Sequence, residues 1–150
     1  MSRVTTKVRI AAPPSEVFEV ALDPWRLGEW VTIHKQTHKA PKRPLKVGDS
    51  VEQTMILRGA PFKVTWRVTE LTPGESATWE GSGPAGSKAR TAYSLKPCAE
   101  GTEFSYLNEF SPPGGLIGRV AAGALVGDIP AKEADASLAR LKALIESGAG

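Results

Sequence analysis

Cysteine, histidine and long apolar stretches are scarce in this sequence. Its 150 residues include one cysteine, Cys98, so no intramolecular disulfide can form. No apolar run approaches the roughly 20 residues that a membrane-spanning helix needs, and residues 1–10 lack the apolar centre of a secretory signal. We therefore expect a soluble, cytoplasmic protein without a membrane span, in which residues 1–150 form a single domain.

A large excess of charge of one sign is also absent. The 19 basic residues are nearly balanced by 16 acidic ones, which leaves a net charge of +3. Strong attraction to nucleic acid usually comes with a clear basic excess. The composition therefore gives little reason to expect nucleic acid as a partner.

Metal and dinucleotide sites have weak support. The only histidines are His34 and His38, and four residues along a strand separate two side chains by about 13 Å, too far to share a metal. The segment Gly81–Gly86 matches GxGxxG, but the residues after it continue as a strand, where a dinucleotide site needs a helix. We expect neither a metal nor a cofactor.

Alternation of apolar and polar residues is the main structural signal. In the run Phe62–Leu71, every second residue from Phe62 to Val68 is apolar, which is typical of a strand with one buried face. Similar runs, separated by glycine- and proline-containing turns, predict further antiparallel strands. The other predicted strands are Val4–Ile10, Val31–His38, Ser50–Arg58, Ser76–Gly81, Ser87–Pro97 and Thr102–Phe110.

Helical patterns follow the first strand and close the sequence. A short helix is predicted to open at Pro14 and to end at Asp23-Pro24, and a second amphipathic turn covers Trp25–Trp30. Near the C-terminus, an apolar stripe predicts an amphipathic helix through Leu138–Ile145. Residues 116–127 before it are rich in glycine and alanine, which would permit close packing or leave room for a ligand.

Four motifs occur in order along the whole chain: Ala12–Phe18, Asp23-Pro24 followed by Trp30, Val47–Asp49 before a strand, and Leu95–Pro97 leading to Gly101-Thr102. Taken in this order, they resemble the START-like (Bet v 1-like) superfamily, also called SRPBCC or polyketide cyclase/dehydrase-like. In addition, the stretch Glu29–Lys35 resembles an actinobacterial subgroup described as toxins of type II toxin–antitoxin pairs.

The resemblance implies an α+β helix-grip fold. In such a fold a curved antiparallel sheet, here of about seven strands, surrounds a long C-terminal helix, and two short helices follow the first strand. Members of the superfamily commonly enclose a cavity for lipids, hormones or polyketides. Pro130 departs from the pattern, because it is expected to kink a helix that relatives keep continuous.

Two residues are candidates for acid–base catalysis. His34 would act as a general base if its side chain faced the interior, whereas the favoured alternative is a hydrogen-bonded or surface histidine on a strand. A buried Asp128 would polarise a ligand carbonyl, whereas the favoured alternative is that it caps the final helix ahead of Pro130.

The inward positions of the predicted strands suggest a ligand cavity. If Trp66 points inward, strand pairing brings a set of aromatic and apolar side chains toward the final helix, with a few polar atoms among them. The alternative for each of these residues is that it fills a packed core. The predicted ligand-binding residues are Trp30, Met55, Val64, Trp66, Trp79, Tyr93, Phe104, Tyr106, Asn108, Val120 and Ala124.

Three functions remain open. The leading hypothesis is a non-enzymatic protein that binds or carries a hydrophobic small molecule, such as a lipid or a polyketide-like compound. The second is a polyketide cyclase or aromatase in which His34 or Asp128 moves a proton. The third follows only from the toxin-like resemblance, and implies a growth-inhibiting protein with a small antitoxin partner.

Overall fold

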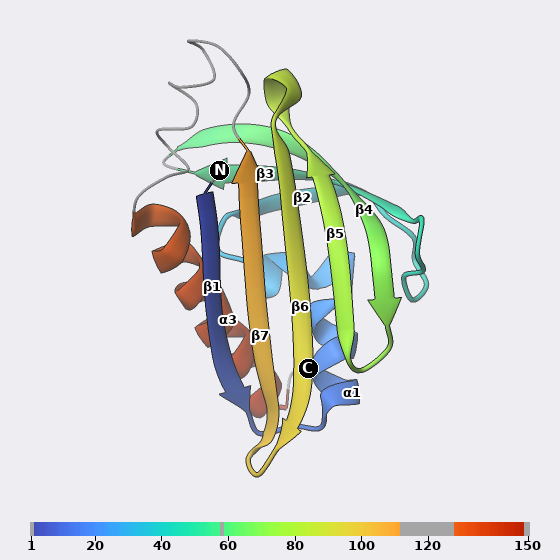
Figure 1. Cartoon of the computed structure of the whole chain (residues 1–150), viewed down its shortest axis with the longest axis vertical. Coiled ribbons are helices and arrows are strands. Elements are labelled where there is room, and N and C mark those ends of the chain that lie inside the picture. The colour runs from blue at the N-terminus through green and yellow to red at the C-terminus, as the bar shows by residue number, and fades with distance from the viewer. Residues whose placement is uncertain (1, 58, 112–127, 149–150) are drawn as a thin grey trace.

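The chain folds around one antiparallel sheet (Figure 1). The computed structural model describes residues 2–57, 59–111 and 128–148. Seven strands pair in the order β1-β7-β6-β5-β4-β3-β2, so the predicted α+β fold with a seven-stranded antiparallel sheet is confirmed. The strands are β1 (Ser2–Ile10), β2 (His34–Lys39), β3 (Ser50–Leu57), β4 (Ala60–Thr72), β5 (Ser76–Ser82), β6 (Lys88–Cys98) and β7 (Gly101–Ser111).

Two short helices follow β1, as the sequence predicts. Helix α1 (Pro14–Ala21) has proline at its first position, where the backbone N–H that proline lacks would have no partner within the helix. The 3₁₀ helix η1 (Pro24–Glu29) begins after Asp23, whose carboxylate accepts the Trp25 backbone N–H at 2.9 Å. A further 3₁₀ turn, η2 (Pro84–Gly86), lies in the connection between the paired strands β5 and β6. This connection leads directly into a strand, so the predicted hairpin is present.

Helix α3 (Asp128–Glu146) lies behind the sheet in the view of Figure 1, alongside β1. The hydroxyl of Thr6 on β1 donates to Asp135 at 2.6 Å, and the Lys142 ammonium donates to the Arg9 carbonyl at 2.8 Å. Pro130 falls in the first turn of α3, where proline is tolerated. Residues 112–127, which include the glycine- and alanine-rich segment expected to permit close packing or to leave room for a ligand, lie outside the described residues. None of the helices in the described ranges is long and apolar enough to cross a membrane.

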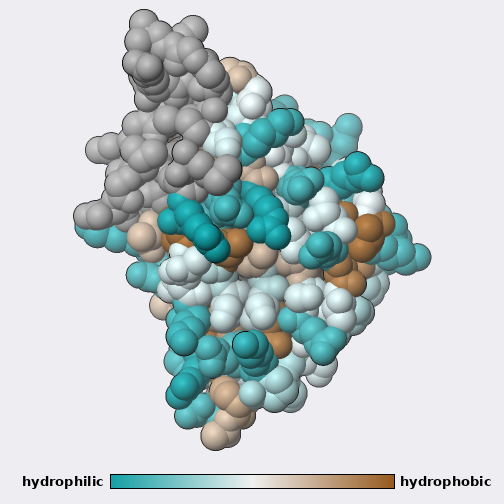
Figure 2. Space-filling view, viewed as in Figure 1, coloured by the Kyte–Doolittle hydropathy of each residue, from teal (hydrophilic) through white to brown (hydrophobic). Residues whose placement is uncertain are grey.

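The two faces of the sheet differ in polarity. The face toward the viewer in Figure 2 is mostly hydrophilic or of intermediate hydropathy. Ion pairs join neighbouring strands, with Arg90 on β6 at 3.1 Å from Glu109 on β7, and Lys7 on β1 at 3.4 Å from Glu103 on β7. Each such exposed pair stabilises the fold by at most about 1 kcal/mol, so burial of the opposite face provides the main stabilisation.

That opposite, concave face holds the core. On β4, Val64 and Val68 are 5% and 0% exposed, which confirms the predicted inward face of this strand. The core continues across the sheet to Phe104 on β7 and is covered by Leu138 and Leu141 of α3. The alternation that defines the strands in the sequence therefore also decides which residues α3 covers.

The predicted start of the second strand is wrong. Sequence alternation placed it at Val31, but β2 begins at His34. Residues 31–33 form a turn instead, in which the Val31 N–H donates to the Leu27 carbonyl at 2.8 Å and the His34 N–H to the Val31 carbonyl at 3.1 Å. Two register shifts within the β2–β3 pairing then break the strict alternation of β2.

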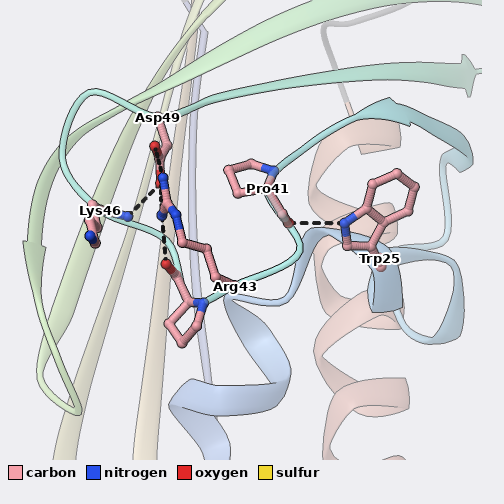
Figure 3. A network of polar contacts seen from close by, with 6 residues as sticks. Trp25, Pro41, Arg43, Lys46 and Asp49 are labelled. Atoms are coloured by element: carbon pink, nitrogen blue, oxygen red, sulfur yellow. Dashed lines mark hydrogen bonds and ion pairs between the residues drawn. The ribbon is translucent and has the colours of Figure 1, made fainter.

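Polar contacts organise the β2–β3 connection (Figure 3). The Arg43 guanidinium makes two hydrogen bonds to the Asp49 carboxylate, at 2.8 and 2.9 Å, and the Lys46 backbone N–H donates to the same carboxylate at 2.7 Å. Across the loop, the indole N–H of Trp25 donates to the Pro41 carbonyl at 3.0 Å. Together these contacts fix the loop that delivers the chain into β3.

A glycine at the β6–β7 turn should be essential for stability. Gly101 has φ of +134°, and an added Cβ would lie 2.6 Å from the Ile10 carbonyl oxygen and the Ala12 nitrogen. We expect Gly101→Ala to lower the free energy of unfolding by roughly 3 kcal/mol or more, because rigid backbone would have to move. Gly74→Ala is the matched control, since Gly74 also has positive φ, at +76°, but its Cβ would meet nothing within 4 Å.

Urea unfolding of both variants checks this expectation. Gly74→Ala should cost only about 1 kcal/mol, the strain of a positive φ alone. Equal losses in the two variants would contradict the close-packing explanation for Gly101.

Candidate functional site

A cavity lies between the concave face of the sheet and α3. The cavity volume is about 130 Å³, which is enough for roughly ten waters at about 10–15 Å³ each. This is smaller than the roughly 300–1,000 Å³ of typical small-molecule sites, so the cavity as it stands suits a small ligand. The lining residues are Val4, Leu27, Trp30, Val31, Ile33, Val51, Gln53, Met55, Leu57, Trp66, Trp79, Thr91, Tyr93, Tyr106, Asn108, Phe110, Glu133, Ala134 and Ser137.

Aromatic rings form the main wall of the cavity, and Tyr93 is at their centre. Its ring centroid lies 6.1 Å from that of Trp30, 6.5 Å from that of Trp79 and 6.0 Å from that of Tyr106. Pairing of β6 with β7 places Tyr93 directly opposite Tyr106, which is why the two rings are adjacent. Such tilted ring pairs are rigid and favourable.

Both tyrosine hydroxyls in this wall are neutral at physiological pH. Burial raises the pKa of Tyr106 to about 12, against hydrogen bonds from Asn108 and Thr91 that lower it. Burial also raises the pKa of Tyr93, and repulsion from Tyr106 adds to this shift. Tyr93 lines the cavity, and no hydrogen bond joins its hydroxyl to a residue in the described ranges.

Two tryptophans of the wall have unsatisfied polar atoms. The indole nitrogens of Trp30 and Trp79 are buried and have no hydrogen-bond partner within the part of the chain that the structure describes. Each buried unpaired donor costs about 1–3 kcal/mol. Such departures from complete hydrogen bonding are typical of functional regions rather than of a core selected only for packing.

A directional chain of hydrogen bonds leads from the cavity wall to His34. The Trp66 indole N–H, which can only donate, bonds to Gln53 Oε1 at 2.7 Å, so the Gln53 amide nitrogen faces His34 and donates to its Nδ1 at 2.7 Å. On the other side, Thr37 donates its hydroxyl hydrogen to the Pro24 carbonyl at 2.7 Å. The Thr37 oxygen, 3.4 Å from His34 Nε2, is therefore left to accept a hydrogen bond.

The directions of these hydrogen bonds require His34 to be neutral, with its proton on Nε2. A protonated ring would present an N–H to the Gln53 amide nitrogen, which cannot accept it. Burial lowers the pKa of His34, and repulsion from His38 lowers it further, in agreement with the geometry. His34 is not among the residues that line the cavity, and it contacts this wall through its hydrogen bond with Gln53.

The turn before β2 is joined to α3 by a second polar cluster. The Thr32 backbone N–H donates to Ser137 Oγ at 3.0 Å, and the Thr32 hydroxyl donates to the carboxylate of Glu133. Ser137 Oγ also lies 3.2 Å from Thr32 Oγ1, to which it donates, because the Thr32 hydrogen is already directed to Glu133. Glu133 is the only charged side chain among the described residues of the cavity lining.

The structure brings together most, but not all, of the predicted binding residues. Those that line the cavity are Trp30, Met55, Trp66, Trp79, Tyr93, Tyr106 and Asn108. Val64 and Phe104 do not line it: both are buried core residues, and Phe104 is fully covered beneath the Trp30 and Tyr93 rings. Val120 and Ala124 lie outside the described residues, and so does the side chain of Asp128.

Sequence reasoning missed the polar residues Gln53, Thr91, Glu133 and Ser137. Gln53 shares the inward face of β3 with Val51 and Met55, so strand alternation contained the signal. Glu133 and Ser137 carried no comparable signal, because their orientation depends on how α3 is rotated against the sheet. Within the described ranges, no group of three or more His, Cys, Asp or Glu side chains is placed to hold a metal ion.

Comparison with known proteins identifies relatives along the whole chain. The family model for polyketide cyclase/dehydrase and lipid transport proteins matches residues 1–146. A protein named toxin Rv0910, from Mycobacterium tuberculosis, is 30% identical over 131 residues, covering 86% of this chain and 91% of the relative. An uncharacterised protein of the same organism, Rv1546, is 27% identical over 133 residues, with 86% and 92% covered.

Solved structures agree in fold. The Zhui aromatase/cyclase from a Streptomyces species matches with a TM-score of 0.81 and 15% identity, over 99% of this chain and 96% of that one. The protein TTHA0849 of Thermus thermophilus matches with a TM-score of 0.80 and 14% identity, over 99% and 100%. At such identities the likeness shows the fold alone. The family match, in contrast, shows that this chain belongs to the polyketide cyclase/dehydrase and lipid transport family.

The neutral state of His34 predicts a pH dependence of stability. An unfolded histidine takes up a proton near its ordinary pKa of 6.5, whereas folded His34 has a lowered pKa. The free energy of unfolding should therefore fall as the pH drops below about 6.5. This loss should stop once the pH is below the lowered pKa of folded His34. We expect His34→Gln to remove this part of the pH dependence.

Urea unfolding at pH 7.5 and pH 5.0 measures the effect. His38→Gln, on the same strand, is the control and should retain the His34-dependent loss. An identical pH dependence in the parent protein and in His34→Gln would show that His34 is not held neutral.

Proposed function

We propose that this member of the polyketide cyclase/dehydrase and lipid transport family binds or carries a hydrophobic small molecule, lipid or polyketide-like, in the cavity between the sheet and α3. The observation that supports this most is the cavity itself. Its wall is mainly aromatic and aliphatic, with a few polar groups at separate positions. This composition is typical of small-molecule sites.

Burial of apolar ligand surface would supply most of the affinity. At about 25 cal/mol per Å², covering 200 Å² of ligand gains roughly 5 kcal/mol before the costs of association. Polar groups in the wall would then orient the ligand. These are the neutral hydroxyl of Tyr93 and the pair Asn108 and Thr91, which both line the cavity, with Thr91 Oγ1 at 3.5 Å from Asn108 Oδ1. Neutral hydroxyls bind ligand oxygens without the desolvation cost of an ion.

The described residues support binding more than catalysis. His34, the candidate base, uses both ring nitrogens in the chain to Gln53 and Thr37 and does not line the cavity. A proton transfer catalyst has to reach its substrate within hydrogen-bond distance. A cyclase with His34 as its base would need this chain of hydrogen bonds to open.

Filling the cavity should weaken ligand binding without unfolding the protein. Ala134 lies on α3, is 7% exposed and lines the cavity. We expect Ala134→Leu to weaken ligand binding at least about tenfold, because its side chain would occupy ligand volume, while the melting temperature stays equal or rises. Ala136→Leu is the control, since Ala136 is exposed on the same helix.

Native mass spectrometry of the purified protein, followed by solvent extraction, identifies a bound molecule and measures its occupancy in each variant. A stoichiometric apolar adduct that Ala134→Leu removes and Ala136→Leu keeps would support the proposal. The absence of any adduct, together with no binding of added apolar probes, would overturn it.

The toxin relative supports a second candidate function. A relative at 30% identity over 86% of the chain is named a toxin, so growth inhibition with a small protein antitoxin is a candidate here. Controlled expression of this protein in a bacterial host should then arrest growth. Expression of Ala134→Leu separates the two functions, because loss of arrest would make toxicity dependent on the cavity, whereas retained arrest would place it on the surface. Unimpaired growth on expression of the parent protein would contradict this candidate.

A further inference from the structure

The charge in the described part of the cavity wall is acidic. Among the described lining residues, Glu133 is charged and the other polar residues are neutral: Gln53, Thr91, Tyr93, Tyr106, Asn108, Ser137 and the three tryptophans Trp30, Trp66 and Trp79. No lysine, arginine or histidine of the described ranges lines this cavity. An anionic ligand group would therefore face a carboxylate without a described cation beside it.

The carboxylate of Glu133 is held in place on one side. Ser137 donates to Thr32 Oγ1, so the Thr32 hydroxyl hydrogen is directed to Glu133 Oε2. The other oxygen, Oε1, has no hydrogen bond to a residue in the described ranges. A carboxylate only accepts hydrogen bonds when ionised, so the free oxygen is suited to a donor.

We propose that the cavity selects a ligand whose polar end is a hydrogen-bond donor, a hydroxyl or an ammonium group, and discriminates against a carboxylate. This inference rests on the proposed binding function and adds the chemical class of the ligand. Glu133 Oε1 accepts the hydrogen of the donor, and the apolar remainder lies against the aromatic wall around Tyr93. A fatty acid would bring a second carboxylate toward Glu133 in a partly desolvated site, where like charges repel strongly.

The same helix offers a matched control. Asp135 accepts a hydrogen bond from the Thr6 hydroxyl at 2.6 Å, much as Glu133 accepts one from Thr32. However, Asp135 is exposed and does not line the cavity. Asp135→Asn therefore removes a threonine-bound carboxylate from α3 without changing the charge of the cavity.

The test uses three probes with one apolar chain and different polar ends: 1-decanol, decylammonium and decanoate. Isothermal titration calorimetry at pH 8 measures their affinities for the delipidated parent protein, Glu133→Gln and Asp135→Asn. In the parent protein, we expect decanoate to bind at least about tenfold more weakly than 1-decanol, and decylammonium to bind at least as tightly as 1-decanol.

Glu133→Gln should shift the two charged probes in opposite directions. Decanoate should gain about tenfold and decylammonium should lose about tenfold, while 1-decanol changes by less than about twofold. The glutamine oxygen can still accept the Thr32 hydroxyl, so the melting temperature should stay close to that of the parent protein. Asp135→Asn should leave all three affinities unchanged, because the asparagine oxygen can still accept the Thr6 hydroxyl that helps to hold α3.

The outcomes separate this inference from the proposed function. If none of the three probes binds, the binding function fails and the ligand class fails with it. If the probes bind but decanoate equals or exceeds 1-decanol, or if Glu133→Gln leaves the ratio of decanoate to decylammonium unchanged, the ligand class is wrong while the binding function stands. Opposite shifts in Glu133→Gln that are absent in Asp135→Asn support the inference.

Discussion

The attachment of α3 at both of its sides is the constraint on which the cavity depends. On one side, Thr6 and the Arg9 carbonyl of β1 bond to the helix. On the other side, Thr32 of the turn before β2 bonds to Glu133 and Ser137. A helix fixed along two lines cannot sink freely into the concave face of the sheet between them. Open volume can therefore persist above the aromatic wall, although a collapsed core would bury more apolar area.

The fold was predictable from the sequence because local patterns determine it. Alternation in segments such as Phe62–Leu71, with glycine turns between them, located the strands to within a few residues, and the inward face of β4 followed directly. The start of β2 was not predictable in this way. Val31 and Ile33 fit the alternation, but the hydrogen bond from the Thr32 backbone to Ser137, more than a hundred residues away, competes with strand pairing there. Long-range contacts of this kind leave no trace in local periodicity.

The candidate site was only partly predictable, for a related reason. Aromatic residues such as Trp66 and Tyr93 were identified because their strands have a regular inward face. Gln53 was within reach of the same reasoning, since the partly buried indole N–H of Trp66 needs an acceptor and Gln53 lies inward on the paired strand. Glu133 was not within reach, because its position in the wall follows from the rotation of α3. Phe104 shows the opposite error: inward orientation placed it correctly in the interior, but it lies beneath the other rings rather than at the cavity surface.

The chemistry of the wall bears on which activities this family member can support. The fold by itself does not choose between a carrier and a cyclase, since function is determined by individual sites. An acid–base reaction needs a base and an acid with suitable pKa values near the substrate. Among the described lining residues, Glu133 carries the one carboxylate, and Tyr106, with its pKa raised to about 12, is a poor acid at neutral pH. One oxygen of that carboxylate already accepts the Thr32 hydroxyl. Within the described residues, the wall therefore supports the proposed binding of a polar ligand end more than it supports an acid–base pair.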